Sequence, residues 1–308
     1  MDTFIKIKVF AKSKSQAQEA TTKAFQEFKR IELLTNRFPE KGTSEYRKSE
    51  IIKINNEAAG QPVPVSKEVF EMLSLAKKYS AETGGAFDVT IGPIMDLWGF
   101  GKDKNTVPDE KMLKKALSLV DFNKIVLDEK RHTVFLEQKN MSIDLGGIAK
   151  GYATEKAGQV LKELGIKKAI INAGGNIYTI GEREKGLPWK IGIQDPREAD
   201  KVYAVLNLRD QVAVTSGDFQ RFFEVNGKRY HHLLDPKTGK PAEKLMSVTV
   251  VAKNSTIADI LSSAFFVLGL EKSNAYLEQH SDIQAVFVTP DKKIICSPGL
   301  KHIIELTD

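Results

Sequence analysis

Residues 141–156, MSIDLGGIAKGYATEK, join an apolar run to a helical pattern through a charged, glycine-rich turn. We expect the apolar run to be a strand that ends in Asp144, followed by a turn with glycines at 146 and 147 and a helix that opens near Lys150 and runs to about Gly165. A helix start behind such a turn presents backbone N–H groups and the positive end of the helix dipole, which suit a phosphate. Alternatively, Asp144 only caps the helix and the glycines only make the turn. The stretch matches neither GxGxxG nor the Walker loop.

Length and composition indicate a soluble globular chain of 308 residues, which suits one large domain or two intimate ones. We treat 1–308 as a single domain, because no linker or repeat marks an internal boundary. The net charge is +6, but the lysines are scattered among acidic residues, so we expect no nucleic-acid partner. Cys296 is the only cysteine, which excludes an internal disulfide and a cysteine-based metal cluster.

Hydrophobic periodicity predicts the α+β fold class, with strands and helices mixed but without strict βαβ alternation. The first expected strand is 3–11, residues 124–137 are expected to form a hairpin, and two strands lie on either side of Gly174-Gly175. Several more strands are expected between 188 and 253, including a hairpin with an Asn226-Gly227 turn, and a last hairpin at 285–297. Four helices are expected. The first contains Ala24, Phe28 and Ile31, and the second runs from a Ser66 cap to Gly84-Gly85. The third follows residue 147, and the fourth covers 255–270. Residues 36–50 read as a polar loop, and 86–101 show no clean period.

The expected helix at 255–270 carries a possible metal site. Asp259 and Ser263 are four residues apart, so both oxygens point from one face of a largely apolar helix. A carboxylate and a hydroxyl near backbone carbonyls form a hard oxygen set that suits Mg²⁺ rather than Zn²⁺. The alternative is a capping box, in which Asp259 reaches back toward Thr256 at the helix start.

Three further segments are candidates beside structural alternatives. His231 and His232 end a strand before a turn, and adjacent strand residues face opposite sides, so only one of them can enter a given pocket. Such a histidine is either an acid or base or a residue that only packs the turn. Asp88 stands among apolar residues and needs partners if it is buried. The NAGGN stretch at 172–176 offers backbone donors or is only a tight turn. TSGD at 215–218 is not a G-x-S-x-G elbow, which disfavours hydrolase-triad chemistry.

Eight motifs occur here in the order shown by one known family. They are MDTF (1–4), GGAFDVTIGPIMDLWGFG (84–101), IDLGGIAKGYA (143–153), INAGGNIY (171–178), WKIGIQDP (189–196), VTSGDFQRFF (214–223), YHHLLDPKTGKP (230–241) and ADILSSAFFVLG (258–269). Together they resemble the ApbE family, the Mg²⁺-dependent FAD:protein FMN transferases once labelled thiamine-biosynthesis lipoproteins. The resemblance covers nearly the whole chain. It implies mixed, mostly antiparallel sheets packed with helices, and an active site in a cleft between two intimately packed halves.

The resemblance also implies a reaction and a set of site residues. Family members cleave the pyrophosphate of FAD, move FMN onto a Thr or Ser hydroxyl of an acceptor flavoprotein, and release AMP. By position, the residues that match FAD contacts are Met1, Ala86, Phe87, Asp88, Asp144, Lys150 and Leu233, and those that match metal ligands are Gly147, Asp259 and Ser263. The family often has Thr at the last of these, and serine keeps the hydroxyl. His232 is the candidate for proton transfer from the acceptor hydroxyl.

Several points stay open from the sequence. Either Phe38 or Tyr46 takes the place of the family's aromatic that packs on the flavin. The same site with water as the nucleophile makes an FAD pyrophosphatase that yields FMN and AMP, and a flavin-binding protein without turnover is a further alternative. The chain lacks the family's acceptor signature, so we expect that it is not its own acceptor. Family members are commonly exported and lipid-anchored, so we expect an extracytoplasmic location, tethered through an N-terminal segment not seen here, with a cytoplasmic one as the alternative.

Overall fold

A computed structural model describes residues 3–102 and 105–307. The chain divides into two compact units, which are described separately. The first unit comprises Met1–Lys29, Lys150–Gln220 and Glu243–Asp308, and the second comprises Arg30–Ala149 and Arg221–Ala242. Met1, expected at the flavin site, lies outside the described residues.

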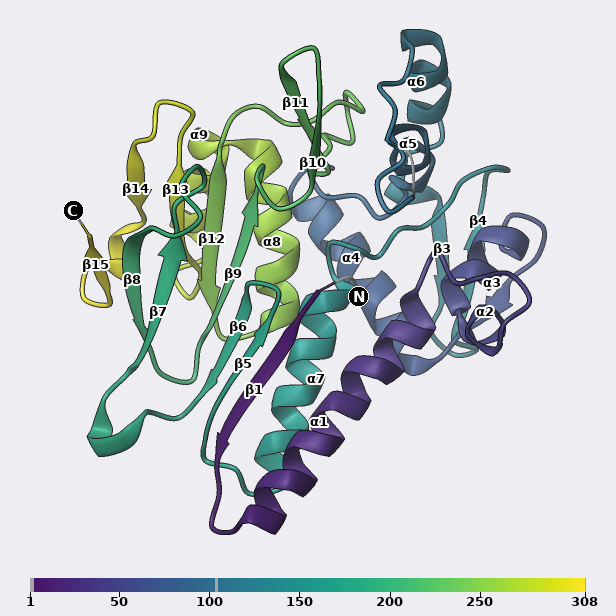
Figure 1. Ribbon diagram of the computed structural model, residues 1–308. Helices are drawn as coiled ribbons and strands as arrows, with labels where there is room; N and C mark the ends of the chain where they lie inside the picture. The colour runs from purple at the N-terminus through teal and green to yellow at the C-terminus, as the bar shows by residue number, and fades with distance from the viewer. Residues whose placement is uncertain (1–2, 103–104, 308) are drawn as a thin grey trace. The chain divides into compact units, whose positions relative to one another are not determined.

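A seven-stranded antiparallel sheet forms the centre of the first unit (Figure 1). Its order is β1 (Ile5–Phe10), β5 (Lys168–Ala173), β6 (Asn176–Ile180), β9 (Val212–Gly217), β12 (Ser247–Ala252), β13 (Gln284–Val288) and β14 (Ile294–Cys296). The helices of this part of the chain are α1 (Lys14–Thr35), α7 (Ala149–Glu163), α8 (Ser255–Leu268) and α9 (Leu270–Gln279). Of these, α7 and α8 run along one face of the sheet (Figure 1).

The opposite face is covered by a smaller sheet, ordered β15 (Ile304–Leu306), β8 (Val202–Leu208) and β7 (Trp189–Gln194), with 3-10 turns at Glu184–Gly186 and Pro298–Leu300. Trp189 and Leu206 of the small sheet pack with Val251 and Val286 of the large one in a buried apolar cluster. Strand β12 is therefore covered on both faces and buried at every position. Each fully buried Val or Ile side chain contributes about 1.5–3 kcal/mol to folding, so this layered core is a main source of stability.

The second unit is richer in helices and short strands. Its helices are α2 (Ser44–Lys48), α3 (Glu50–Glu57), α4 (Lys67–Glu82), α5 (Gly92–Trp98) and α6 (Glu110–Leu117), with a 3-10 turn at Phe122–Lys124. Its strands are β2 (Val63–Pro64), β3 (Ile125–Asp128) and β4 (Thr133–Leu136) in one sheet, and β10 (Phe222–Val225) and β11 (Lys228–His231) in another. Trp98 is buried against Phe100, Phe223 and Tyr230, and its indole N–H donates to the carbonyl of Gly239 at 2.7 Å.

Most elements expected from the sequence are confirmed. The fold is α+β, every pair of named strands is antiparallel, and Ser66 caps α4 through a hydrogen bond from the amide of Val69. Asn226 and Gly227 have φ of 52° and 75°, as a type I′ turn requires.

Two predicted elements are wrong, and several helices lie where none was predicted. The supposed loop 36–50 contains α2, which is capped by Thr43, and the region 86–101 contains α5. The apolar run before Asp144 is not a strand, because it forms only an isolated bridge between Ser142 and Ile91. Helix α9 was not expected. Over the described residues, no helix has both the length and the apolar character needed to cross a membrane.

Helices α7 and α8 of the first unit approach each other at Gly151. A Cβ built on Gly151 would lie 2.4 Å from the carbonyl oxygen of Ser255 and 2.5 Å from the Cβ of Asp259. Both neighbours belong to the body of α8 and cannot swing away. Glycine is therefore required here by the close approach of two helices.

We expect Gly151→Ala to lower the free energy of unfolding by about 1–3 kcal/mol, because the added methyl group forces the helices apart. Urea unfolding followed by circular dichroism measures the change. Gly60→Ala is the matched control, since a Cβ there meets only the Glu57 carbonyl oxygen at 3.5 Å, an ordinary contact. An unchanged unfolding midpoint for Gly151→Ala would show that the helices can separate at little cost.

Candidate active site

A buried carboxylate joins the start of α7 to α8 in the first unit. Asp259 is only 3% exposed, and its Oδ2 accepts a hydrogen bond of 2.7 Å from the backbone N–H of Gly151. Its Oδ1 lies 3.5 Å from the ammonium of Lys150. A buried charge needs such partners, and the N-terminal end of α7 adds a favourable dipole. Lys150 and Asp259, which the sequence analysis named separately, are thus brought together.

Helix α8 does not use Asp259 as a cap. Its N-cap is Asn254, whose side-chain oxygen accepts from the amide of Ile257 at 3.0 Å. The capping-box alternative is therefore wrong. Ser263 follows one turn after Asp259 and is half-buried, while the intervening Ser262 bonds to the hydroxyl of Ser216 at 2.8 Å.

Asp259 and Ser263 supply a carboxylate and a hydroxyl, which are oxygen donors of the kind that magnesium prefers. Among the residues that the structure describes, no group of three or more His, Cys, Asp or Glu side chains could hold a metal. Magnesium, however, is commonly bound through one or two carboxylates with substrate phosphates supplying the rest. A carboxylate has about four lone-pair sites, so Asp259 keeps acceptor capacity beyond its two N–H partners. The hydroxyl of Ser263 is a second hard oxygen at the i+4 position.

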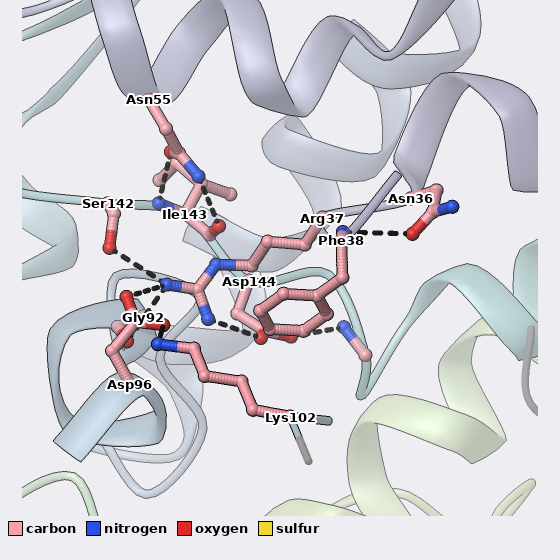
Figure 2. A network of polar contacts seen from close by, with 11 residues as sticks. Asn36, Arg37, Phe38, Asn55, Gly92, Asp96, Lys102, Ser142, Ile143 and Asp144 are labelled. Atoms are coloured by element: carbon pink, nitrogen blue, oxygen red, sulfur yellow. Dashed lines mark hydrogen bonds and ion pairs between the residues drawn. The ribbon is translucent and has the colours of Figure 1, made fainter. Parts of the chain in front are cut away.

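The Gly-Gly turn of the second unit is held by an ion network around Arg37 (Figure 2). Asp144 accepts from the amide of Gly146 at 2.8 Å, so it caps the turn rather than α7, which begins only at Ala149. Its second oxygen accepts from Arg37 at 3.2 Å. The same guanidinium bonds to Asp96 and to the carbonyl of Gly92 at 3.0 Å. The turn that carries Gly147 is therefore preorganised by a buried cation.

Arg37 escaped the sequence analysis because it stood in a stretch interpreted as a polar loop. Its side chain is only 8% exposed, and it lies 5.3 Å from the ring of Phe38. Figure 2 shows Phe38 beside Arg37 and Asp144. Tyr46 lies instead on α2, where its hydroxyl accepts from Asn56 at 3.4 Å. Of the two aromatic candidates, Phe38 is the one that adjoins the Asp144 network.

Ala86, Phe87 and Asp88 form a buried loop before α5. Asp88 accepts from the amide and hydroxyl of Thr90 at 2.8 and 2.7 Å and from the amide of Phe122 at 3.0 Å. Burial raises the pKa of this carboxyl above its ordinary value, although these hydrogen bonds act in the opposite direction. Asp88 has the partners that a buried carboxylate needs, and it fixes the loop.

The two adjacent histidines have different environments. His231 is buried, its Nδ1 accepts from the amide of Leu233 at 3.3 Å, and its Nε2 bonds to the carbonyl of Ala242 at 2.9 Å. His232 is half-buried, and its Nδ1 lies 3.2 Å from the carbonyl oxygen of Arg221. A carbonyl only accepts, so in the neutral ring of His232 the proton is on Nδ1 and the lone pair is on Nε2. His231 therefore packs the turn, and His232 has the tautomer of a base.

We expect Asp88→Asn to lower stability at neutral pH by about 1–3 kcal/mol, because an amide nitrogen then faces an N–H or O–H donor. The deficit relative to wild type should widen as the pH falls from neutral toward about 4. In that range, native Asp88 takes up a proton before unfolded Asp88 does, which stabilises only the wild type. Urea unfolding of both proteins across this range tests the expectation. A deficit that shrinks at acid pH would contradict the raised pKa.

Comparison with known proteins identifies the family. A model of the ApbE family matches residues 1–287. The chain is 39% identical over 270 residues to a FAD:protein FMN transferase of Klebsiella pneumoniae, covering 87% of this chain and 84% of that protein. It is 38% identical over 275 residues to a FAD:protein FMN transferase of Treponema pallidum, covering 84% and 76%.

Solved structures agree with the sequence comparison. The ApbE protein from Thermotoga maritima superposes with a TM-score of 0.89 at 32% identity, over 98% of this chain and 96% of that one. The flavin transferase ApbE from Vibrio cholerae gives a TM-score of 0.86 at 25% identity, with the same coverage. The chain belongs to the ApbE family, and the resemblance inferred from its eight motifs is confirmed.

Proposed function

We propose that this chain is a FAD:protein FMN transferase. It cleaves the pyrophosphate of FAD, attaches FMN to a Thr or Ser hydroxyl of an acceptor protein, and releases AMP. The family and its named relatives support the flavin-transfer activity. The observation that carries the chemistry is the pairing of Lys150 with buried Asp259 at the start of a helix, which suits a phosphate and a divalent cation together.

Charge neutralisation is the main task in this proposal. The pyrophosphate is anionic and repels an incoming nucleophile, so positioning and electrostatic stabilisation account for most of the catalysis. Lys150 holds phosphate oxygens, and the positive end of the α7 dipole adds a favourable field, while the amides of Ala149 and Gly151 already donate to Leu145 and Asp259. Asp259 and Ser263 bind Mg²⁺, which when bound supplies Lewis-acid polarisation of the phosphoryl group and stabilises the leaving AMP. The resemblance adds a main-chain oxygen at Gly147, which stays a prediction.

His232 acts as the general base. The acceptor hydroxyl oxygen forms a bond to the phosphorus of the FMN half, and the bond from that phosphorus to the bridging oxygen breaks, with AMP leaving. The hydroxyl proton passes to Nε2 of His232. The carbonyl of Arg221 supports this role because it holds the proton of the neutral ring on Nδ1.

The flavin half has its own set of contact residues. Ala86, Phe87, Asp88 and Leu233 are assigned by the resemblance, as are Asp144 and Met1. We add Phe38 as the aromatic that packs on the flavin ring, because it adjoins the Asp144 network and is 43% exposed, so its ring is accessible.

The partners follow from the reaction. They are FAD and acceptor flavoprotein subunits with a Thr- or Ser-containing flavinylation motif. The chain itself lacks that motif, so we expect no covalent flavin on the purified protein. The proposal includes an extracytoplasmic location, with the protein tethered through an N-terminal lipid anchor, because members of the family are commonly exported and lipid-anchored.

The first test measures the products of FAD. Purified protein, FAD and Mg²⁺ are incubated with and without an acceptor carrying a Thr-containing motif, and AMP and acceptor-bound flavin fluorescence are quantified. Fluorescence on the denatured acceptor that is lost with EDTA is the expected result. AMP with free FMN and no labelled acceptor would make the protein a pyrophosphatase, and FAD binding without AMP would leave a flavin-binding protein.

We expect Asp259→Ala to abolish Mg²⁺-dependent AMP release, with a loss of at least about a hundredfold, because the carboxylate for the metal is gone. The fold should persist by circular dichroism. Asp282→Ala removes an exposed carboxylate of the same unit and serves as the control. Retained activity in Asp259→Ala would mean that Asp259 only joins α7 to α8.

We expect His232→Ala to slow acceptor labelling by about 10²–10⁴-fold while FAD binding stays intact, because only proton transfer is removed. Quenching of flavin fluorescence measures FAD binding, and gel fluorescence measures labelling. His302→Ala, an exposed histidine, is the control. Equal losses of binding and labelling would assign His232 to the binding site instead.

A further inference from the structure

Asn176 is a polar residue at a fully buried position of the large sheet. It begins β6 and is 0% exposed. Alternate residues of a strand share a face, so Asn176 lies on the same face as Tyr178 and opposite Ile177. Tyr178 packs against Gly158 and bonds to Lys162, both on α7, while Ile177 belongs to the core cluster shared with the small sheet. The amide of Asn176 is therefore directed toward α7.

The contact that Asn176 makes there is with Lys150. The ammonium donates to Oδ1 of Asn176 at 2.7 Å, whereas it lies 3.5 Å from the carboxylate of Asp259. An ammonium has no acceptor, so the amide oxygen must face it, and this fixes the orientation of the amide. The shorter contact is with the neutral partner, so Lys150 is drawn away from full pairing with Asp259.

The orientation of the amide has a cost. Nδ2 of Asn176 is buried and has no hydrogen-bond partner among the residues that the structure describes. A buried donor left unsatisfied lowers the free energy of unfolding. Leucine has nearly the same size and would avoid that cost, so folding stability alone does not account for asparagine at this position.

We propose that Asn176 is a positioning residue for Lys150. It holds the ammonium beside Asp259 without letting the two charges pair closely. The ammonium then faces an anionic ligand, and the carboxylate keeps acceptor capacity. The ligand is the pyrophosphate of a dinucleotide, which rests on the proposed function. In the absence of Asn176, the ammonium closes on Asp259, because an opposite charge is the remaining partner nearby.

The test is a double-mutant cycle on FAD affinity. Wild type, Asn176→Leu, Lys150→Met and the double variant are titrated by quenching of flavin fluorescence, with EDTA and with Mg²⁺. We expect Asn176→Leu to weaken binding about tenfold, a change of about 1.4 kcal/mol. It should have no further effect in the Lys150→Met background, because it acts through Lys150. Additive losses, or wild-type affinity in Asn176→Leu, would overturn the proposal.

Stability and a control residue exclude a general structural effect. Asn176→Leu should unfold at the same urea concentration as wild type or a higher one, and Asn176→Ala is the second variant if leucine does not fit. Asn172→Ala is the matched control, because Asn172 near the end of β5 flanks the Gly174-Gly175 turn as Asn176 does, is exposed, and accepts from the amide of Gly175 rather than from Lys150. A loss of FAD affinity in Asn172→Ala equal to that in Asn176→Leu would make the turn, not Lys150, responsible.

A measurement without FAD keeps the inference separate from the proposed function. Trace acetylation of Lys150 by acetic anhydride, followed by peptide mass spectrometry, reports the environment of the ammonium. We expect labelling in Asn176→Leu to be at least about threefold slower than in wild type, since an ammonium held in closer contact with buried Asp259 is less accessible to the reagent. If wild type binds no FAD, the proposed function is wrong. An unchanged or faster labelling rate would overturn the role of Asn176 in any case.

Discussion

The hydrogen bond from the amide of Gly151 to the buried carboxylate of Asp259 is the constraint on which the first unit's site depends. It requires α7 to begin where α8 passes, and it requires a residue without a Cβ at 151. Because the bond uses the first turn of α7, the carboxylate, the Lys150 ammonium and the helix dipole converge at one place. A single packing requirement thus places an ammonium, a buried carboxylate and the N-terminal end of a helix together.

In the second unit, a buried cation rather than a buried carboxylate fixes the arrangement of its neighbours. Arg37 is buried, and it holds Asp96, Asp144 and the carbonyl of Gly92 at once. Its Nε has no partner among the residues described, so this network is not arranged for stability alone. Buried polar groups of this kind specify one arrangement of a loop, which a site for a flexible dinucleotide needs.

Asn176 belongs with these residues. It shows the same pattern, since one of its polar groups holds a charged neighbour and the other has no partner. The orphaned donors at Asn176 and Arg37 both adjoin residues expected to contact FAD. Under the proposed function, these two unpartnered donors near the FAD site lower the free energy of unfolding, and in return Lys150 and Asp144 are already in position before FAD binds.

Periodicity and turn chemistry in the sequence determined much of the framework. The amphipathic pattern of α1, the Ser66 cap, the Asn226-Gly227 hairpin and the buried helix α8 depend on interactions within a few residues. Such interactions can be recognised from local spacing. The family was equally accessible, because its motifs are ordered along the chain. Asp259 and Ser263 were placed on one helical face for the same reason.

Only the tertiary structure showed which partners the candidate residues have. Asp259 was either a cap or a ligand, and it proved to bond to Gly151, 108 positions away in the sequence. Arg37 looked like a loop residue until its contacts with Asp96 and Asp144 were seen, and the amide of Asn176 had no visible partner before Lys150 was placed beside it. Local patterns specify helices and turns because their energies are short-ranged. A buried charge is defined by partners that are distant in the chain, and folding alone brings those partners together.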